Sequence, residues 1–258
     1  MPATIDTTEG TCALDLLKAP VTVLVGHFGS GKTEIAVNLA VALKHRGENV
    51  TLADLDLVKP YFRSRLARHE LASLGIPVMV PEGDRVYADL PILVPQVKGL
   101  VATAGNGVGR AVLDVGGDDL GARVLGAIAG LTDPAHTDVL FVVNGRRPFA
   151  ETLEEVVTML REVEAASRLR VTGLVANTHL MDETTPEVVG EGLALAQRLA
   201  GLTGIPLLFC AVLEKLSGSP DIRAVVGELP VLPLVRRITP PFAVKARLPV
   251  PQKGAAVV

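Results

Sequence analysis

The chain contains no tryptophan, and aromatic residues make up only 3% of it. The core must therefore be filled by aliphatic side chains, and hydrophobic residues supply 48% of the sequence. Cores built from Val, Leu, Ala and Ile are typical of α/β proteins whose parallel strands are buried on both faces. The 258 residues are enough for one large domain or two small ones.

Cysteine is equally scarce, since Cys12 and Cys210 are the two in the chain and form no CxxC pair. This pattern does not suggest a zinc site or a disulfide framework, and it fits a reducing compartment. The net charge of −3 gives no support for general nucleic-acid binding. No run approaches the ~20 apolar residues that span a bilayer, and the first residues lack the basic and then apolar pattern of a signal peptide. We therefore expect a cytoplasmic protein that binds neither membrane nor nucleic acid.

Short apolar runs alternate with segments whose apolar residues recur at helical spacing, as Leu153, Val156, Val157, Leu160 and Val163 do. This order predicts a three-layer α/β fold, with a mostly parallel sheet of about seven strands and helices on both faces. The predicted strands are Val21–Val25, Val50–Ala53, Val78–Val80, Ala111–Leu113, Val139–Val143, Val171–Val175 and Leu207–Phe209.

No repeat or linker divides the chain, so we expect one domain over residues 1–237. Residues 238–258 differ, because their prolines prevent a continuous helix. We interpret this segment as a tail that is extended on the domain or disordered, without the amphipathic helix that membrane binding needs. Its prolines are Pro240, Pro241, Pro249 and Pro251.

The first predicted strand runs directly into GHFGSGKT, which has the GxxxxGK[ST] pattern of a phosphate-binding loop (P-loop). Glycines let successive N–H groups turn toward phosphate oxygens, and the following helix, from about Lys32 to Arg46, presents its positive end to the same anion. The alternative is a glycine-rich turn with a chance Lys-Thr pair. The predicted nucleotide-binding residues are Gly26, His27, Phe28, Gly29, Ser30, Gly31, Lys32, Thr33, Glu34 and, from a later strand, Asn177.

Carboxylates follow two other predicted strands. Asp54 and Asp56 end the second strand, and Asp114 ends the fourth, just before Gly116 and Gly117. Ligands of a doubly wound sheet bind beyond the carboxyl ends of its strands, so these acids are suited to hold Mg²⁺ and to orient a water molecule. Each acid taken alone is also consistent with a helix cap or an Asp-Gly turn.

The chain resembles the MinD/ParA family of ATPases, which includes CobQ/CobB-like members, in GHFGSGKTEIAVNLAVALKHRGENVTLADLDL, VLDVGGDD and LVANTHL. The resemblance implies ATP and Mg²⁺ as ligands, with Thr33, Asp54 and Asp114 around the metal. It also implies that Asp56 positions the attacking water while Lys32 faces the β- and γ-phosphates. Many members carry a second lysine after the first glycine of the loop, which reaches the nucleotide across a dimer. Here His27 takes that position, and this places the nucleotide-sandwich dimer in doubt.

The segment after the sixth predicted strand bears on the choice of base. GTP-binding proteins read guanine with the Asp of an N-K-x-D loop, but here Thr178 and Leu180 replace its Lys and Asp. ATP is therefore the expected ligand, and the resemblance gives Asn177 as a contact of adenine. The alternative for Asn177 is a turn residue at a strand end.

Other residues leave alternatives open. Arg146 and Arg147 follow the fifth predicted strand, where an arginine can contact a phosphate or a substrate acid, and the alternative is a basic turn. His179 is interpreted as a surface or capping residue. Lys59 to Arg68 combines aromatic and basic residues directly after the second strand, and either packs on the sheet edge or contacts a protein partner or second protomer.

Three functions remain: a slow ATPase that switches its contacts with a partner or assembles it, a small-molecule kinase or ligase, and a silent nucleotide sensor. A kinase needs a lid over the γ-phosphate, and no insertion of that size is visible. The paired Asp54 and Asp56 disfavour the sensor.

Overall fold

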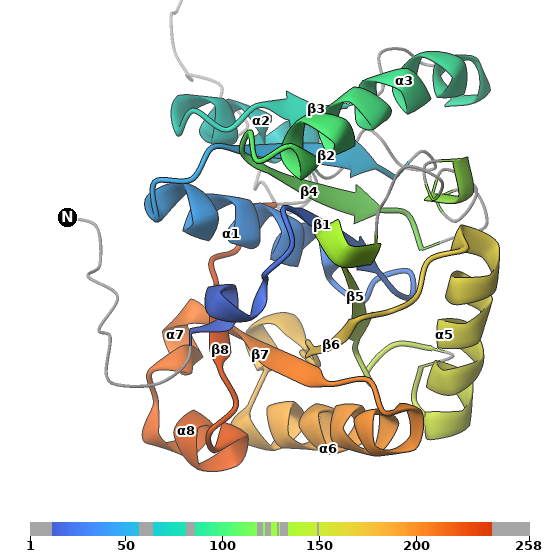
Figure 1. The fold of residues 1–258 in the computed structure, drawn as a ribbon. Helices are drawn as coiled ribbons and strands as arrows, with labels where there is room; N and C mark the ends of the chain where they lie inside the picture. The colour runs from blue at the N-terminus through green and yellow to red at the C-terminus, as the bar shows by residue number, and fades with distance from the viewer. Residues whose placement is uncertain are drawn as a thin grey trace, which may run out of the picture.

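The computed structural model describes residues 12–56, 64–80, 86–117, 121, 125–127, 129, 134–148 and 150–238. Among these residues, eight strands form one sheet in the order β3-β2-β4-β1-β5-β6-β7-β8, and every neighbouring pair is parallel (Figure 1). The strands are β1 (Val21–Val25), β2 (Val50–Leu55), β3 (Val78–Met79), β4 (Arg110–Val115), β5 (Thr137–Val143), β6 (Gly173–Ala176), β7 (Leu207–Leu213) and β8 (Val231–Leu234).

Helices cover both faces of this sheet, as Figure 1 shows with α1 and α5 on opposite sides. One apolar cluster joins the sheet to α1, α2 and the short helix η1, and the other joins it to α3, α5, α6 and α8. The predicted three-layer α/β fold is therefore confirmed. The helices are η1 (Ala13–Leu16), α1 (Lys32–His45), α2 (Ser64–Ser73), α3 (Val86–Gly105), η2 (Pro134–His136), α5 (Leu153–Ser167), η3 (Met181–Glu183), α6 (Pro186–Thr203), α7 (Glu214–Ser217) and α8 (Pro220–Val226).

Strand β8 is the one that the apolar runs did not predict. It has four residues and contains Pro233, a residue that usually argues against a strand because it has no N–H for the ladder. In this sheet β8 pairs with β7 alone and lies at the edge, where a missing donor costs little. The sheet therefore has eight strands instead of about seven.

Two helix starts show how local signals set the boundaries. Helix α1 begins at Lys32 as predicted and ends at His45, after which Gly47 adopts a φ of +84°. Helix α5 begins at Leu153, the first residue of the apolar stripe that the sequence showed at helical spacing. The cause is a capping box, in which the Thr152 hydroxyl accepts from Glu155 N and the Glu155 carboxylate accepts from Thr152 N.

Alternation along the strands places the predicted site acids. Val50 and Leu52 of β2 and Val112 of β4 point to the cluster that contains α1. Asp54 and Asp114 share the parity of these residues, so both face the α1 side at the carboxyl ends of their strands. Within the described residues, no helix is long and apolar enough to cross a bilayer. The predicted tail from residue 239 onward lies outside the described part of the chain.

Candidate functional site

The loop between β1 and α1 is held in a shape that requires glycine. Gly26 has a φ of +139° and Gly31 a φ of +95°, conformations that L side chains rarely adopt. A Cβ on Gly26 would lie 2.7 Å from the Val142 carbonyl oxygen, and one on Gly31 would lie 2.2 Å from Asn177 Nδ2. Because the backbone passes so close to its neighbours, the curled loop is built into the fold at the centre of the sheet.

Lys32 is the first residue of α1, directly after this loop, and it is only 4% exposed. Its ammonium group donates to the carbonyl oxygens of Gly26 at 2.9 Å and His27 at 2.8 Å. A buried cation is therefore held by the loop itself, at the start of a helix whose N-terminal end is also positive. This arrangement is suited to receive a phosphate anion.

Asp54 and Asp114 stand side by side in the β2–β4 register and are each 2% exposed. Asp56 follows just past the end of β2, and its backbone N–H donates to Asp54 Oδ1 at 3.0 Å. The Thr33 hydroxyl group hydrogen-bonds the Asp114 carboxyl group. The three acids and Thr33 that the sequence singled out are therefore gathered beneath the loop.

The pKa of Asp114 is raised to about 7, first by burial and then by the neighbouring Asp54 carboxylate, while Thr33 and Lys32 act in the opposite direction. Two buried acids beside each other favour a shared proton or a cation. Among the described residues, no hydrogen-bond partner reaches Asp114 Oδ2. A buried oxygen in this condition is a suitable ligand for a divalent cation.

Asn177 connects the end of β6 to the loop. Its backbone N–H donates to Val143 O at 2.8 Å, and its Nδ2 donates to Ser30 O at 2.7 Å. Its side-chain oxygen Oδ1 is buried and has no hydrogen-bond partner in the described part of the chain. The amide thus holds the loop from below, which is a role that the strand-end position alone did not indicate.

A model of the CobQ/CobB/MinD/ParA nucleotide binding domain matches residues 21–206. The chain belongs to this family. The matched range runs from the start of β1 to just before β7, so it includes the loop, all three acids and Asn177. This P-loop domain therefore carries the nucleotide-binding fold that its sequence resembles.

Two curated relatives and one solved structure are similar to this chain. The protein named cytosolic Fe-S cluster assembly factor nubp2 from Xenopus laevis is 26% identical over 223 residues, covering 76% of this chain and 80% of that protein. Its Xenopus tropicalis counterpart is 27% identical over 219 residues with the same coverage. Chloroplast FtsY from Physcomitrella patens superposes with a TM-score of 0.51 at 20% identity over 85% of this chain and 64% of that one. The P-loop domain thus spans less than two thirds of that FtsY structure, and the likeness concerns the fold alone.

The two arginines after β5 take different roles in this CobQ/CobB/MinD/ParA domain. Arg146 forms an ion pair with Glu191 of α6, as expected for a basic turn. Arg147 is turned the other way, and its Nε donates to Gly29 O of the P-loop at 2.8 Å. Of the two, Arg147 is therefore the one at the ligand edge of the sheet.

His179 lies closer to the P-loop than a surface histidine would. Its Nδ1 accepts from Met181 N at 3.3 Å, which is the predicted capping role, but its Nε2 lies 3.6 Å from the position of a Cβ on Gly31. The pKa of His179 is lowered to about 4, mainly by burial and then by the charges of Arg147 and Arg236. The ring is therefore neutral, and because Nδ1 accepts a hydrogen bond, the proton is on Nε2 beside the loop.

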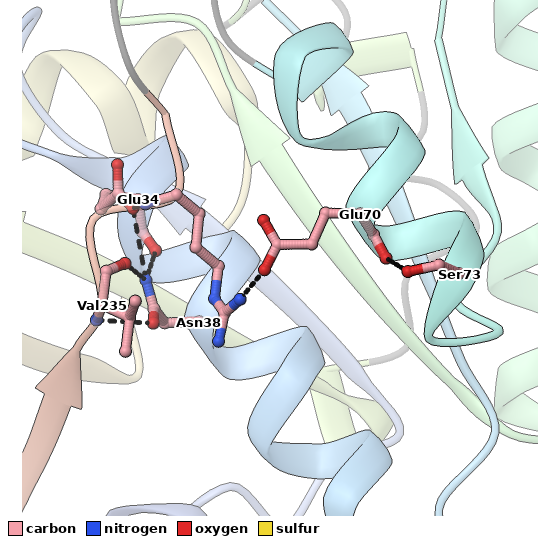
Figure 2. Close-up of polar contacts among 6 residues, drawn as sticks. Glu34, Asn38, Glu70, Ser73 and Val235 are labelled. Atoms are coloured by element: carbon pink, nitrogen blue, oxygen red, sulfur yellow. Dashed lines mark hydrogen bonds and ion pairs between the residues drawn. The ribbon is translucent and has the colours of Figure 1, made fainter. Parts of the chain in front are cut away.

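Glu34 was included in the nucleotide-binding set, but its side chain is engaged elsewhere. Its carboxylate accepts from Arg237 N at 2.6 Å. Figure 2 shows Glu34 and Asn38 of α1 facing Val235, where Asn38 Nδ2 donates to Val235 O and Asn38 Oδ1 accepts from Val235 N, both at 3.0 Å. The Arg237 guanidinium also pairs with Glu70 of α2. A contact between Glu34 and a nucleotide would therefore have to come from its backbone.

The remaining predicted residues lie on the outer side of the P-loop. His27 Nδ1 is 2.7 Å from Phe28 O, and the Phe28 side chain is 45% exposed. The glycine pair after β4 packs against this part of the loop, since a Cβ on Gly117 would lie 2.6 Å from Phe28 N. The segment Lys59 to Arg68 lies outside the described residues up to residue 63, and the rest of it begins α2.

Proposed function

We propose that this protein binds ATP together with Mg²⁺, hydrolyses it slowly, and uses the cycle to switch or assemble a partner protein. The observation that supports this best is the buried pair Asp54–Asp114 beneath the P-loop, with Asp114 Oδ2 lacking a partner within the described residues. A nucleotide-binding domain without hydrolysis does not need two buried acids whose charges repel each other.

The metal in this proposal is held jointly by protein and nucleotide. Within the described residues, no group of three or more His, Cys, Asp or Glu side chains could hold a metal ion unaided. Mg²⁺ usually combines one or two protein oxygens with waters and substrate phosphates. Thr33, Asp54 and Asp114 would supply the protein oxygens, and the ion would neutralise charge on the phosphates.

The geometry of the acids and of Lys32 supports the proposed catalytic roles. Asp56 is 7% exposed and tied to Asp54 through its N–H, so its own carboxylate can orient a water molecule near the terminal phosphate. Lys32 lies on the loop carbonyls of Gly26 and His27 and can transfer its donors to the developing charge.

ATP is proposed over GTP because no acid stands where guanine is read. Leu180 occupies that position and is 39% exposed, and an apolar side chain cannot accept the two N–H donors of guanine. Asn177 remains the proposed adenine contact. Its Oδ1 would have to turn out of its buried position to accept from the adenine amino group.

The partner function draws on the relatives. Nubp2 is named as a cytosolic Fe-S cluster assembly factor, and we propose that this chain likewise acts in the cytoplasm on another protein. It does not offer the cysteines of a cluster site itself. Cys12 and Cys210 are the two in the sequence, Cys210 is buried in β7, and its pKa is raised to about 12 by burial. An Fe–S cluster takes four thiolate ligands, so the switch function is favoured over cluster binding by this chain alone.

The proposed contact segment of the switch is Lys59 to Arg68, which binds a second protomer or a partner protein in the ATP state. Transfer of the γ-phosphate to a small molecule is the alternative function. Hydrogen exchange over residues 56–70, measured with ADP and with a non-hydrolysable ATP analogue, tests whether this segment is the switch. Protection that is equal in both states would exclude the segment as the switch.

Calorimetry with Mg·ATP and Mg·GTP tests the nucleotide part of the proposal. We expect tighter binding of Mg·ATP and phosphate release in the absence of any small-molecule acceptor. Equal or tighter GTP binding would contradict the choice of base. Phosphate transfer to a small molecule without release to water would favour the kinase.

A further inference from the structure

The turn after β5 is constructed so that neighbouring arginines point in opposite directions. Asn144 Oδ1 accepts from Arg146 N at 3.1 Å, and Gly145 N donates to Thr178 Oγ1 at 3.0 Å. Arg146 then reaches α6 while Arg147 reaches the P-loop. Side-chain hydrogen bonds of this kind fix a turn locally, so the position of Arg147 on the loop is set by its own strand end.

Within the described residues, the charge of Arg147 has no acidic partner. Its Nε donates to Gly29 O, and no acidic partner or further acceptor is assigned to its guanidinium among the described residues. Arg146, one residue earlier, has Glu191. A guanidinium has five N–H donors, so four on its two terminal nitrogens remain available while the side chain is half-buried.

Other positive features converge on the same place. Lys32 lies within the loop and the N-terminal end of α1 begins there. His179 is neutral nearby, partly because of the charge of Arg147. Like charges brought together in this way are unfavourable unless an anion is bound between them. The uncompensated arginine therefore indicates a ligand whose negative charge exceeds what Lys32 alone would neutralise.

We propose that Arg147 is a nucleotide-binding residue that anchors on Gly29 and donates its terminal N–H groups to the phosphate chain of the bound nucleotide. This proposal rests on the proposed function, in which the P-loop binds ATP. Arg147 would give the bound phosphates a cationic contact from within the same chain. The loop has no second lysine for this purpose, because His27 takes that position. A simple structural support of the loop by the Nε bond is the alternative.

Binding of ATP, ADP and inorganic pyrophosphate to Arg147→Ala tests the proposal, with Arg146→Ala as the matched control. We expect Arg147→Ala to weaken ATP and pyrophosphate binding by about 10- to 100-fold, the usual loss for a hydrogen bond to a charged group. Arg146→Ala is expected to bind as wild type does. Arg147→Lys keeps one charge but not the fork and is expected to recover part of the affinity.

A readout that a structural support would leave unchanged is the ³¹P spectrum of bound ADP. Direct contact predicts that its resonances differ between wild type and Arg147→Lys at saturating ADP. Identical spectra, or equal affinities of Arg147→Ala and Arg146→Ala, would overturn this inference while leaving the proposed function in place. Wild-type protein that fails to bind ATP would overturn the proposed function and this inference with it.

Discussion

On one side of β1 the neighbouring strands β4 and β2 end in carboxylates, whereas on the other side β5 and β6 end in carboxamides. Asp54 and Asp114 are buried next to each other, and their repulsion is relieved by a proton or a cation. Asn144 and Asn177 are also buried, but they are neutral and hold backbone groups directly. The charges of one half of the ligand edge therefore depend on what is bound, whereas the buried side chains of the other half are neutral and already hydrogen-bond the backbone.

We expect the two halves to have different roles because of this difference. The acidic half would respond to Mg²⁺ and to the number of phosphates, because its charges are unbalanced without them. The amide half would hold the P-loop in shape before nucleotide binds, through the hydrogen bond from Asn177 to Ser30. The loop lies between them and is bonded to both, through Thr33 on one side and Ser30 on the other.

The largest expected effect is that of Lys32→Ala, which removes the cation shared by both halves. We expect ATP affinity to fall by roughly 10²-fold or more, because several charge-assisted hydrogen bonds are lost together. Calorimetry measures this, and Lys44→Ala, in the last turn of the same helix, is the control. A variant that kept wild-type affinity with an intact circular-dichroism spectrum would show that the loop does not bind phosphate in this way.

Asp56→Ala should separate binding from hydrolysis within the acidic half. Turnover is expected to fall by about 10²-fold or more if this carboxylate positions the water. ATP affinity is expected to stay close to that of wild type, since the metal ligands Thr33, Asp54 and Asp114 remain. Phosphate release and calorimetry give the two values, with the exposed Asp221→Ala as control. Unchanged turnover would make Asp56 a structural residue.

Asn177→Ala addresses the amide half. It leaves the buried Ser30 carbonyl without its donor and should lower the free energy of unfolding by about 1–3 kcal/mol. Because no cation is involved, the loss should be the same with and without Mg²⁺. Urea unfolding measures it, and Asn106→Ala, in an exposed turn, is the control. A loss that depended on Mg²⁺ would break the proposed division between the halves.

The smallest effect is expected in the pH dependence of nucleotide-free wild-type stability, because the two halves oppose each other. The raised pKa of Asp114 means that the folded state binds an extra proton. The contribution of Asp114 to the free energy of unfolding therefore falls as pH rises from about 4 to about 7. The lowered pKa of His179 means that the unfolded state binds the extra proton. The contribution of His179 to the free energy of unfolding is therefore complete above about pH 6.5 and is lost as pH falls toward 4.

Relative to wild type, Asp114→Asn should therefore gain stability as pH rises through this range, and His179→Asn should lose it. Melting temperatures across pH 4 to 7 report the two slopes. Parallel curves for the three proteins would show that neither group titrates differently in the folded state.

Much of the fold could be predicted because the signals are local. Apolar runs gave seven of the eight strands, and the P-loop pattern gave the start of α1. Strand β8 could not be found this way, since Pro233 opposes a strand everywhere except at an edge. That β8 is the edge depends on the order of all the other strands, which no local pattern contains.

The site divides in the same manner. The acids and the loop follow from strand ends and a short motif, and the structure brings them together as expected. The direction of a side chain does not follow from such patterns. Arg146 and Arg147 are adjacent and identical in type, yet partners distant in the chain separate their roles. For His179 and Glu34 the deciding contacts likewise come from segments far along the sequence.

The bonds between Asn38 and Val235 join residues 197 positions apart, and this has a consequence for synthesis of the protein. Chains emerge from the ribosome N-terminus first, so α1 is made long before the segment that receives Asn38 and Glu34. The first two turns of α1, which carry Glu34 and Asn38, therefore lack these partners until nearly all of the described chain has been translated. Such a nascent chain already has its P-loop, but it lacks the segment around Val235 and Arg237 that bonds to α1. We expect it to bind nucleotide weakly until residue 237 has been made and has left the ribosome.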